Sequence, residues 1–435
     1  MPSITKNKVF RKLYEYAFNL RWNHYEFFWR LYFNKLLLND KYRQLAIINK
    51  KSSSDADFCV TKKPVVDLNL TGRKILFAIH WMELGGAESY ALHCIKRAKQ
   101  LGAETHVFST VWSKNKDKAA FQKYADSVTD ITKISSDINA LPLILSFIKE
   151  RQIDVLHIHH SSLIYYYLPI IKTVYPHLKV IDSLHIVEYK TGGFPETASY
   201  YSNNIDIHNV ITRSLGQFMD ARSKAHKHNV VRAKIINTYL VDISEENSEE
   251  PRPIIENNGV NLLFYGRFAN QKQPYLFSHI VTNLAKKYGA KISINAHMVG
   301  DGELLEPLKK LISKTKKIII HPRNDDKNQV FSLANVLILP SLNEGLTLTA
   351  YEAVSRGVLV ISSDVGAQHE LLPAECLVNI WCNNPTEQFV NTISYFIDNP
   401  DQARNAILAS QRNLKRLQQE TLTDNIIQEF YGVIQ

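Results

Sequence analysis

The sequence predicts an α/β protein built from two Rossmann-like, doubly wound parallel-sheet domains that face a cleft. From Lys74 onward, short apolar strands alternate with amphipathic helices, which is typical of a parallel sheet covered by helices on both faces. An acidic, proline-bearing stretch at 244–259 interrupts this series, and a second series of the same kind follows. The 435 residues, 45% hydrophobic and 22% charged, suffice for a core in each domain.

These patterns divide the chain into six segments. We expect a helical extension at 1–50, a linker at 51–72, a first sheet domain at 73–243, a second linker at 244–259, a second sheet domain at 260–420, and a C-terminal helix at 421–435 that covers the outside or crosses back to the first domain. The four cysteines form no CxxC pair, which favours a reducing compartment. With no apolar run of about 18 residues and no signal-peptide pattern, these features predict a cytoplasmic protein.

The extension combines a basic charge with an apolar helix pattern. Residues 1–52 hold eleven Lys or Arg against three acids, a large part of the net charge of +10. Polar residues recur every three or four positions from Lys12 to Asn34, and aromatic and leucine side chains fill the other faces. A helix this apolar must be covered. Two interpretations stay open: self-association or packing on the main body, and peripheral anchoring to an anionic membrane surface.

The linker contains a carboxylate pair, Asp55 and Asp57, with a spacing that also occurs in metal sites. The pair lies among serines without flanking strands, which favours a flexible connection over a metal site.

After the first expected strand, 74–80, Gly85 and Gly86 precede a helix at 88–101. Paired glycines before a helix start allow a diphosphate to approach the backbone, although the same pair also occurs in simple tight turns.

Further strands are expected at 105–110, 155–159, 179–183 and 208–212, and histidines follow their ends. Ligands collect at the carboxyl ends of parallel strands, so these histidines face the expected cleft. Alternation places His157 and His159 on one face, but no third metal ligand is evident. His185 is the stronger functional candidate, because it follows a strand end and precedes Glu188 and a glycine-rich loop.

The second half carries cations and carboxylates in the corresponding loops. Arg267 and Lys272 follow the strand 261–265, where a guanidinium and an ammonium can bind phosphate oxygens. Glu344 and Glu352 lie eight positions apart, one in a loop and one about two turns into a helix expected at 346–356. The free amides of a helix start form an anion site, and carboxylates bind sugar hydroxyls. This half therefore predicts a sugar-nucleotide site.

Four motifs together resemble the retaining glycosyltransferases of family 4, which have the GT-B fold. They are Gly85-Gly-Ala-Glu88, Gly266-Arg267 with Lys272, Gly300-Asp-Gly302, and Glu344-x7-Glu352 with Gly345. The resemblance covers roughly 73–420 and is more specific in the second half. It implies a nucleotide diphosphate-sugar donor bound mainly by the second domain, an acceptor bound mainly by the first, no cofactor and no required metal.

The resemblance also assigns roles to residues. It implies that Arg267 and Lys272 bind the diphosphate, Glu352 the ribose, and Glu344 and His185 the donor sugar. The implied catalytic residues are His185, Arg267, Lys272 and Glu344. The implied donor-binding set is Gly85, Gly86, Gly266, Arg267, Lys272, Gly302, Glu344, Gly345, Leu346, Thr347 and Glu352. The acceptor-side candidates are Glu88, His159 and Glu188. Two positions depart from the family pattern: Thr347 replaces a proline, and Gln273 replaces the glycine after the lysine.

We therefore expect a retaining hexosyl- or N-acetylhexosaminyltransferase that uses a UDP-sugar rather than a GDP-sugar. Its acceptor is expected to be a glycan or lipid-linked glycan of lipopolysaccharide, capsule or teichoic-acid type. A sugar-nucleotide epimerase or hydrolase of the same architecture, and a non-catalytic binding subunit, are the alternatives. No nucleic-acid partner is expected, because the excess positive charge lies outside the sheet domains and no nucleic-acid-binding motif is present.

Overall fold

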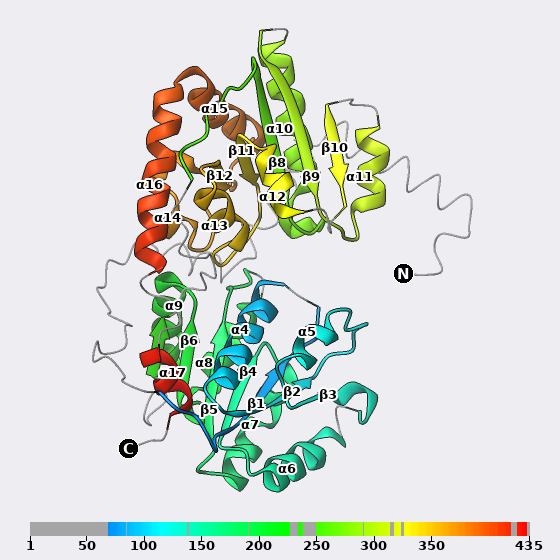
Figure 1. Ribbon diagram of the computed structural model, residues 1–435, viewed down its shortest axis with the longest axis vertical. Coiled ribbons are helices and arrows are strands. Elements are labelled where there is room, and N and C mark those ends of the chain that lie inside the picture. The colour runs from blue at the N-terminus through cyan, green and yellow to red at the C-terminus, as the bar shows by residue number, and fades with distance from the viewer. Residues whose placement is uncertain are drawn as a thin grey trace, which may run out of the picture.

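The computed structural model describes residues 68–83, 85–136, 139–189, 191–226, 234–237, 249–289, 291–313, 317–322, 326–418 and 424–432. The expected helical extension, most of the first linker and the pair Asp55 and Asp57 lie outside these residues. Figure 1 shows two lobes, one above the other, each with a central sheet flanked by helices. The predicted α/β fold with two doubly wound domains is confirmed.

The first domain is built on a parallel sheet with the strand order β3-β2-β1-β4-β5-β6-β7. Its strands are β1 (Lys74–Ile79), β2 (Glu104–Ser109), β3 (Ser127–Asp130), β4 (Val155–His159), β5 (Lys179–Leu184), β6 (Ile207–Val210) and β7 (Lys234–Asn237). The order reverses between β1 and β4, and such a switch point is where open sheets bind ligands.

Helices follow the strands of this sheet and cover its two faces. They are α4 (Gly86–Gln100), α5 (Lys118–Gln122), α6 (Ala140–Arg151), α7 (Ser162–Val174), α8 (Gly193–Tyr200) and α9 (Arg213–Ala225). One apolar core packs α6 and α7 against the sheet, and a second packs α4 against the opposite face. Since both faces are covered, the central strands are fully buried, which explains their continuous apolar runs.

The second domain repeats the arrangement with the strand order β10-β9-β8-β11-β12-β13, again parallel. Its strands are β8 (Gly259–Tyr265), β9 (Ser293–Val299), β10 (Ile318–His321), β11 (Val336–Leu339), β12 (Leu359–Ser363) and β13 (Leu377–Val378). Its helices are α10 (Pro274–Tyr288), α11 (Leu305–Ile312), α12 (Lys327–Ser332), α13 (Leu348–Ser355), α14 (Gln368–Leu371), α15 (Pro385–Asp398) and α16 (Pro400–Gln418). The switch point here lies between β8 and β11.

The C-terminal helix α17 (Asp424–Tyr431) returns to the first domain (Figure 1). Ile427, Phe430 and Tyr431 are fully buried there against β1 and α4. The Arg73 Nε donates to the Tyr431 carbonyl at 2.9 Å, and the Lys179 Nζ donates to the Glu429 carbonyl at 2.6 Å. The chain therefore joins the two domains twice.

Residues 249–258, part of the expected second linker, pack on the second domain. The Glu249 amide donates to the Ser355 carbonyl at 2.8 Å, the Arg252 amide donates to the Gly357 carbonyl at 2.8 Å, and Ile254 joins the apolar core. Among the helices that the structure describes, none combines the length and hydropathy needed to span a bilayer.

Candidate active site

Three loops at the carboxyl ends of β8, β11 and β12 are joined by backbone contacts. The Leu342 amide donates to the Gln271 carbonyl at 2.8 Å, and the Ala367 amide donates to the Gly345 carbonyl at 3.0 Å. A Cβ on Gly366, whose φ is +55°, would lie 1.9 Å from the Glu344 carbonyl oxygen. Only glycine permits this approach, so the loop that carries Glu344 and Gly345 has a fixed position.

The Gly300-Asp-Gly302 turn supports the loop that carries Arg267. The Phe268 amide donates to the Asp301 carbonyl at 2.9 Å. A Cβ on Gly302 would lie 2.6 Å from the Phe268 carbonyl oxygen, and one on Gly300 would lie 2.0 Å from the Gly266 carbonyl oxygen. Gly302 therefore lets two backbone segments pack closely and fixes the loop that starts at Gly266.

Lys272 and Glu344 form an ion pair at the centre of this loop cluster. Their Nζ and Oε1 atoms lie 2.5 Å apart, and the Glu344 side chain is 8% exposed. A carboxylate this buried is costly unless it is paired. The Lys272 ammonium has three donors, so it can hold Glu344 and still offer N–H groups to a phosphate oxygen.

Glu352 forms a second pair, nearer to solvent. Its Oε1 lies 2.7 Å from Lys327 Nζ, with side-chain exposures of 23% and 52%. The expected helix start at 346 is wrong: α13 begins at Leu348, so Glu352 lies about one turn into the helix rather than two. Leu346 is buried in the core, and the Thr347 Oγ1 accepts a hydrogen bond from Gln368 Nε2. The Thr347 hydroxyl that replaces the family's proline is therefore already engaged.

His185 and Gly345 mark a close contact between the two domains. A Cβ on Gly345 would lie 2.0 Å from the His185 carbonyl oxygen. The His185 ring packs edge-on against Tyr90 and His160, at centroid distances of 5.3 and 5.0 Å. This contact brings the His185 backbone next to the loop of Glu344, although His185 belongs to the first domain and Glu344 to the second.

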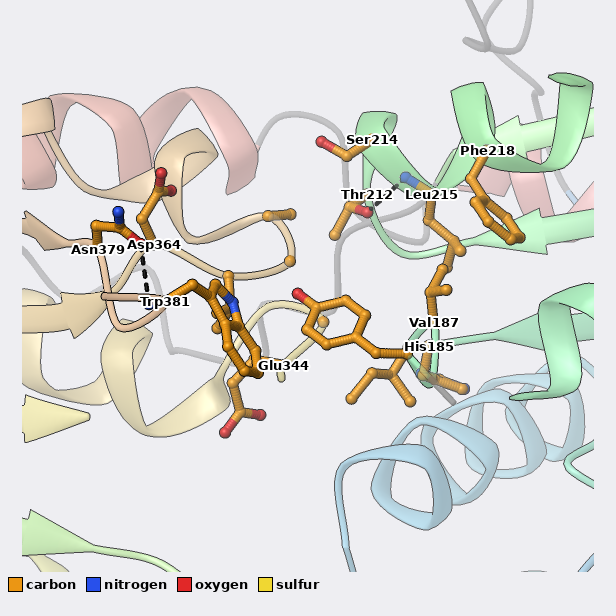
Figure 2. A pocket seen from close by; sticks show the side chains of 16 residues that line it. His185, Val187, Thr212, Ser214, Leu215, Phe218, Glu344, Asp364, Asn379 and Trp381 are labelled. Carbon is orange, nitrogen blue, oxygen red and sulfur yellow. Dashed lines mark hydrogen bonds between the residues drawn. The ribbon is translucent and has the colours of Figure 1, made fainter. Parts of the chain in front are cut away.

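A cavity of about 520 Å³ lies between the domains beside this contact. Figure 2 shows Thr212, Ser214 and Phe218 of the first domain on one side, and Asp364, Asn379 and Trp381 of the second domain on the other. His185, Glu344 and Gly345 line the cavity as well. Across it, the rings of Tyr189 and Trp381 meet edge-on at 5.9 Å. The domains therefore enclose a ligand-sized space, and the predicted site residues His185, Glu344 and Gly345 border it.

Arg267 of the second domain acts electrostatically on Glu88 of the first domain. The Arg267 side chain is exposed, and its positive charge is near enough to act on the pKa of Glu88. Burial nevertheless dominates and raises the pKa of Glu88 to about 7. The Glu88 Oε2 accepts a hydrogen bond from the Gly85 amide at 3.0 Å, while Oε1 lies 3.0 Å from His80 Nε2. Gly85 and Gly86 are exposed at the start of α4.

Histidines gather at the carboxyl ends of β1, β4 and β5. The members of this histidine cluster are His80, His157, His159, His160 and His185. Burial lowers the pKa of His80 to about 4 and the pKa values of His157 and His185 to about 3. It also holds the pKa values of His159 and His160 well below 6.5. The cluster is therefore neutral at pH 7.

His157 and His159 lie inside the first-domain sheet. His157 and His159 share one face of β4, as expected, with ring centroids 4.1 Å apart. Both nitrogens of His157 are occupied at 2.8 Å, by the Tyr431 hydroxyl and the Ser183 hydroxyl. His159 is buried behind the strand ends at 1% exposure. Within the described residues, no group of three or more His, Cys, Asp or Glu side chains has the arrangement of a metal site.

Glu188, a predicted acceptor-side residue, forms contacts within its own turn. Its side chain is exposed and accepts a hydrogen bond from the Thr191 hydroxyl at 3.0 Å, while its carbonyl accepts from the Gly192 amide at 2.7 Å. A Cβ on Gly193 would lie 3.1 Å from Glu188 Cγ. Glu188 therefore stabilises the turn into α8.

Sequence reasoning missed Glu370, which links the domains. Its carboxylate accepts hydrogen bonds from the Ser214 hydroxyl at 2.8 Å, the Ser214 amide at 3.1 Å and the Arg213 amide at 3.3 Å. These groups form the start of α9 in the first domain, where a carboxylate complements the helix dipole. The signal available in the sequence was its position six residues after Asp364, which follows a strand end. His80, Lys327 and Trp381 were missed as well.

Comparisons with known proteins agree with this architecture. Residues 84–219 match the family model described as Glycosyltransferase Family 4, and residues 246–413 match the model described as Glycosyl transferases group 1. Together the two models cover more than half of the chain and part of each sheet. The fold and the paired loops at its cleft thus define a two-domain, GT-B type α/β protein. The chain belongs to the glycosyltransferases that combine these two domains.

Curated relatives match parts of the chain. The O-antigen biosynthesis glycosyltransferase WbnH of Escherichia coli is 28% identical over 144 residues, 32% of this chain and 39% of the relative. The UDP-Gal:alpha-D-GlcNAc-diphosphoundecaprenol alpha-1,3-galactosyltransferase of Escherichia coli is 27% identical over 164 residues, 37% of this chain and 41% of the relative. The matches therefore span about two fifths of each relative's length.

Solved structures share the fold over most of the chain. Anabaena HepE, in a complex with UDP and glucose, aligns with a TM-score of 0.61 at 14% identity, covering 82% of this chain and 98% of that one. The sucrose-phosphate synthase of Thermosynechococcus elongatus aligns with a TM-score of 0.58 at 14% identity, covering 82% and 97%. At these identities the likeness establishes the fold alone.

Proposed function

We propose that the protein transfers a hexosyl or N-acetylhexosaminyl group, with retention of configuration, from a UDP-sugar to a glycan or lipid-linked glycan acceptor. The product would belong to a cell-surface polysaccharide of lipopolysaccharide, capsule or teichoic-acid type, made at the cytoplasmic side of the membrane. The observation that carries the proposal is the buried pair of Lys272 and Glu344 beside the interdomain contact of Gly345 and His185. The O-antigen enzymes among the relatives support the substrate class.

The charges on the second domain suit departure of a nucleotide diphosphate. Breaking the bond between the anomeric carbon and the diphosphate oxygen leaves growing negative charge on the phosphate. Lys272, Arg267 and the amides at the start of α13 would stabilise that charge more in the transition state than in the substrate. In other enzymes a divalent metal neutralises the charge of the departing diphosphate. Here these cations would do so, and we propose transfer without metal or other cofactor.

The proposed transfer takes place on one face of the donor sugar. The acceptor oxygen forms its bond to the anomeric carbon as the carbon–diphosphate bond breaks, and the acceptor proton passes to the departing phosphate oxygen. No protein nucleophile is required. A double displacement would need two carboxylates about 5 Å apart at the reacting carbon. Glu344 and Glu352 instead bind different lysines, from the β8–α10 loop and from α12.

The test is a transfer assay on the full chain with UDP-sugars, with GDP-sugars as the comparison, and lipid-diphosphate-linked glycans as acceptors. We expect sugar transfer that EDTA leaves unchanged and an α-linked product from an α-linked donor, as read by the anomeric coupling in NMR. An inverted product would refute retention. Loss of activity with EDTA and its recovery with Mg²⁺ would refute metal independence. Release of free sugar or an epimerised sugar nucleotide without acceptor would favour the hydrolase or epimerase alternative.

A further inference from the structure

The first domain contains a buried hydrogen-bond network that the proposed mechanism does not use. Its first member is Tyr431 of α17, whose hydroxyl lies 2.8 Å from His157 Nδ1 on β4, and His157 Nε2 lies 2.8 Å from the Ser183 hydroxyl on β5. Asn209 Nδ2, on β6, donates to the Ser183 hydroxyl at 2.9 Å and to the Tyr90 hydroxyl of α4 at 2.7 Å. The network therefore runs from α17 across three neighbouring strands to α4.

Every side chain of this network is removed from solvent. All five are 0% exposed. The Cys94 thiol, also buried, interacts with the hydroxyls of both Tyr431 and Tyr90, which adds a second and shorter link from α17 to Tyr90. Hydrogen bonds in a low-dielectric interior strengthen one another, and an unpaired member is costly, so a satisfied network holds its members in one arrangement.

Tyr90 connects the network to the cleft. Its ring packs edge-on against the His185 ring, with a centroid distance of 5.3 Å and an interplanar angle of 71°. His185 follows β5 and lines the cavity between the domains. The His185 ring is therefore supported from behind by a tyrosine whose hydroxyl is bound by Asn209.

Tyr431 reaches the network because the chain returns from the second domain. α16 packs on the second domain and α17 on the first. Arg73 Nε donates to the Tyr431 carbonyl at 2.9 Å and holds the end of α17 in place. The neighbouring Phe430 fills its part of the same core without a hydroxyl. Packing alone therefore does not account for the hydroxyl of Tyr431, whose partner is His157.

We propose that Tyr431 is a positioning residue for His185: through the network it fixes the Tyr90 ring and, with it, the orientation of the His185 ring in the cleft. The inference rests on the proposed function, since His185 matters here as a residue that contacts the donor sugar. A His185 ring that turns more freely spends less time in the reactive arrangement, so kcat depends on Tyr431. UDP binding does not, because Arg267 and Lys272 belong to the second domain.

The first experiment observes His185 directly. The full chain is prepared with isotope-labelled histidine, and the His185 ring signal in the NMR spectrum is identified as the one that His185→Ala removes. Tyr431→Phe removes only a hydroxyl, and we expect it to shift or broaden this signal. The control is Tyr175→Phe, because the Tyr175 hydroxyl donates to the Leu145 carbonyl at 2.8 Å, at the end of α7 away from the cleft. An unchanged His185 signal in Tyr431→Phe overturns the inference.

The second experiment measures kinetics with a UDP-sugar. Tyr431→Phe should lower kcat about tenfold and change the KM for the UDP-sugar less than about twofold, because misplacement of a site residue acts mainly on the transition state. In a His185→Ala background the same substitution should change kcat less than about twofold, because the residue that it positions is gone. Equal losses in the two backgrounds overturn the inference, since Tyr431 would then act without His185.

Tyr90→Phe covers the case in which Tyr431→Phe does not fold. It keeps the ring beside His185 and removes the hydroxyl that Asn209 binds, so it should move the same NMR signal and lower kcat by a similar factor. A wild-type signal and a wild-type kcat in Tyr90→Phe contradict the inference.

The outcomes separate this inference from the proposed function. If the wild-type chain transfers no sugar from any UDP-sugar, the proposed function fails, and the His185 signal alone decides whether Tyr431 positions that ring. If transfer occurs while the His185 signal in Tyr431→Phe matches that of the wild type, the inference fails and the proposed function stands.

Discussion

The two domains share the same order over six strands, with β7 added in the first, but they carry different chemistry at the carboxyl ends of their strands. In the second domain these ends hold ion pairs, Lys272 with Glu344 and Lys327 with Glu352. In the first domain they hold the neutral histidine cluster and, beside it, the buried carboxylate of Glu88. The scaffold therefore positions the loops, and the side chains placed on them decide whether a half of the cleft suits an anion or an uncharged group.

The two domains also differ in how far their charged and titratable side chains are exposed to solvent. Glu352 and Lys327 remain partly in solvent, where their mutual attraction is weak, whereas Glu344 is nearly buried and depends on Lys272. In the first domain, burial lowers the pKa values of His157 and His185 to about 3 and so keeps both rings uncharged.

The largest expected effect comes from the second domain's buried pair. Lys272→Ala leaves the Glu344 carboxylate unpaired and removes a cation from the proposed leaving group, so kcat should fall about 10²- to 10³-fold. Lys327→Ala, which removes the more exposed partner of Glu352, should cost much less. Steady-state kinetics with a UDP-sugar would compare them. Equal losses in the two variants would remove the distinction between the buried and the exposed pair.

The contact between the halves can be tested with two glycines. Gly345→Ala places a Cβ 2.0 Å from the His185 carbonyl oxygen, so the domains must shift apart. Overpacking costs about 1–3 kcal/mol, and we expect kcat/KM to fall about tenfold or more. Gly259→Ala is the matched control, because Gly259 lies at the start of β8, away from the cleft, and the nearest atom to a Cβ there would be the Ser293 carbonyl oxygen at 3.4 Å, an ordinary contact. Unchanged kinetics for Gly345→Ala would mean that the two halves need not meet at this point.

A smaller effect should follow from the link made by Glu370. Glu370→Ala removes the carboxylate that accepts from the Ser214 and Arg213 amides, and we expect the free energy of unfolding to fall by about 1–3 kcal/mol. Urea denaturation measures it. The exposed Glu375, on the same domain, gives the control Glu375→Ala, which should change little. A similar loss from both would assign the effect to the second domain itself rather than to its contact with α9.

The smallest effect concerns the neutral histidines and pH. The pKa of buried His157 is about 3, below the value of about 6.5 for an unfolded histidine. The unfolded chain therefore binds the proton first as pH falls below 6.5, and stability is lost down to about pH 3, by up to about 1.4 kcal/mol per pH unit. Glu88 acts oppositely between about pH 4.5 and 7, because its raised pKa favours the folded state at lower pH.

His157→Gln should make the melting temperature fall less steeply between pH 6.5 and 4.5, since glutamine does not titrate. The exposed His177 provides the control His177→Gln. Melting curves at several pH values give both slopes. A wild-type slope in His157→Gln would show that the histidine cluster does not govern acid stability.

The sequence was sufficient to predict the long buried strands, but it did not predict three of the short edge strands. Strands such as β1, β4 and β11 are covered on both faces, so their apolar runs are continuous. The strands β3, β7 and β13 were missed. Each has one neighbour and at most four residues, so each leaves only a short pattern in the sequence.

The sequence was sufficient to identify several residues of the candidate site, but it did not show which of them contact one another. Glu344 and Lys272 stand out by their spacing and loop positions, yet nothing in the sequence indicates that they pair. Lys327 comes from α12, and Glu370 reaches a helix of the other domain, so their roles depend on tertiary packing. Glu188 had the right position after a strand but serves a local turn.

The return of α17 to the first domain has a consequence for how the chain matures. Ile427, Phe430 and Tyr431 complete a core whose other members, such as Phe77 and Tyr90, are made hundreds of residues earlier. During synthesis on the ribosome, part of the apolar core of the first domain therefore stays uncovered until the second domain and α17 have emerged. Its final folding step therefore depends on the emergence of α17 rather than on its own length.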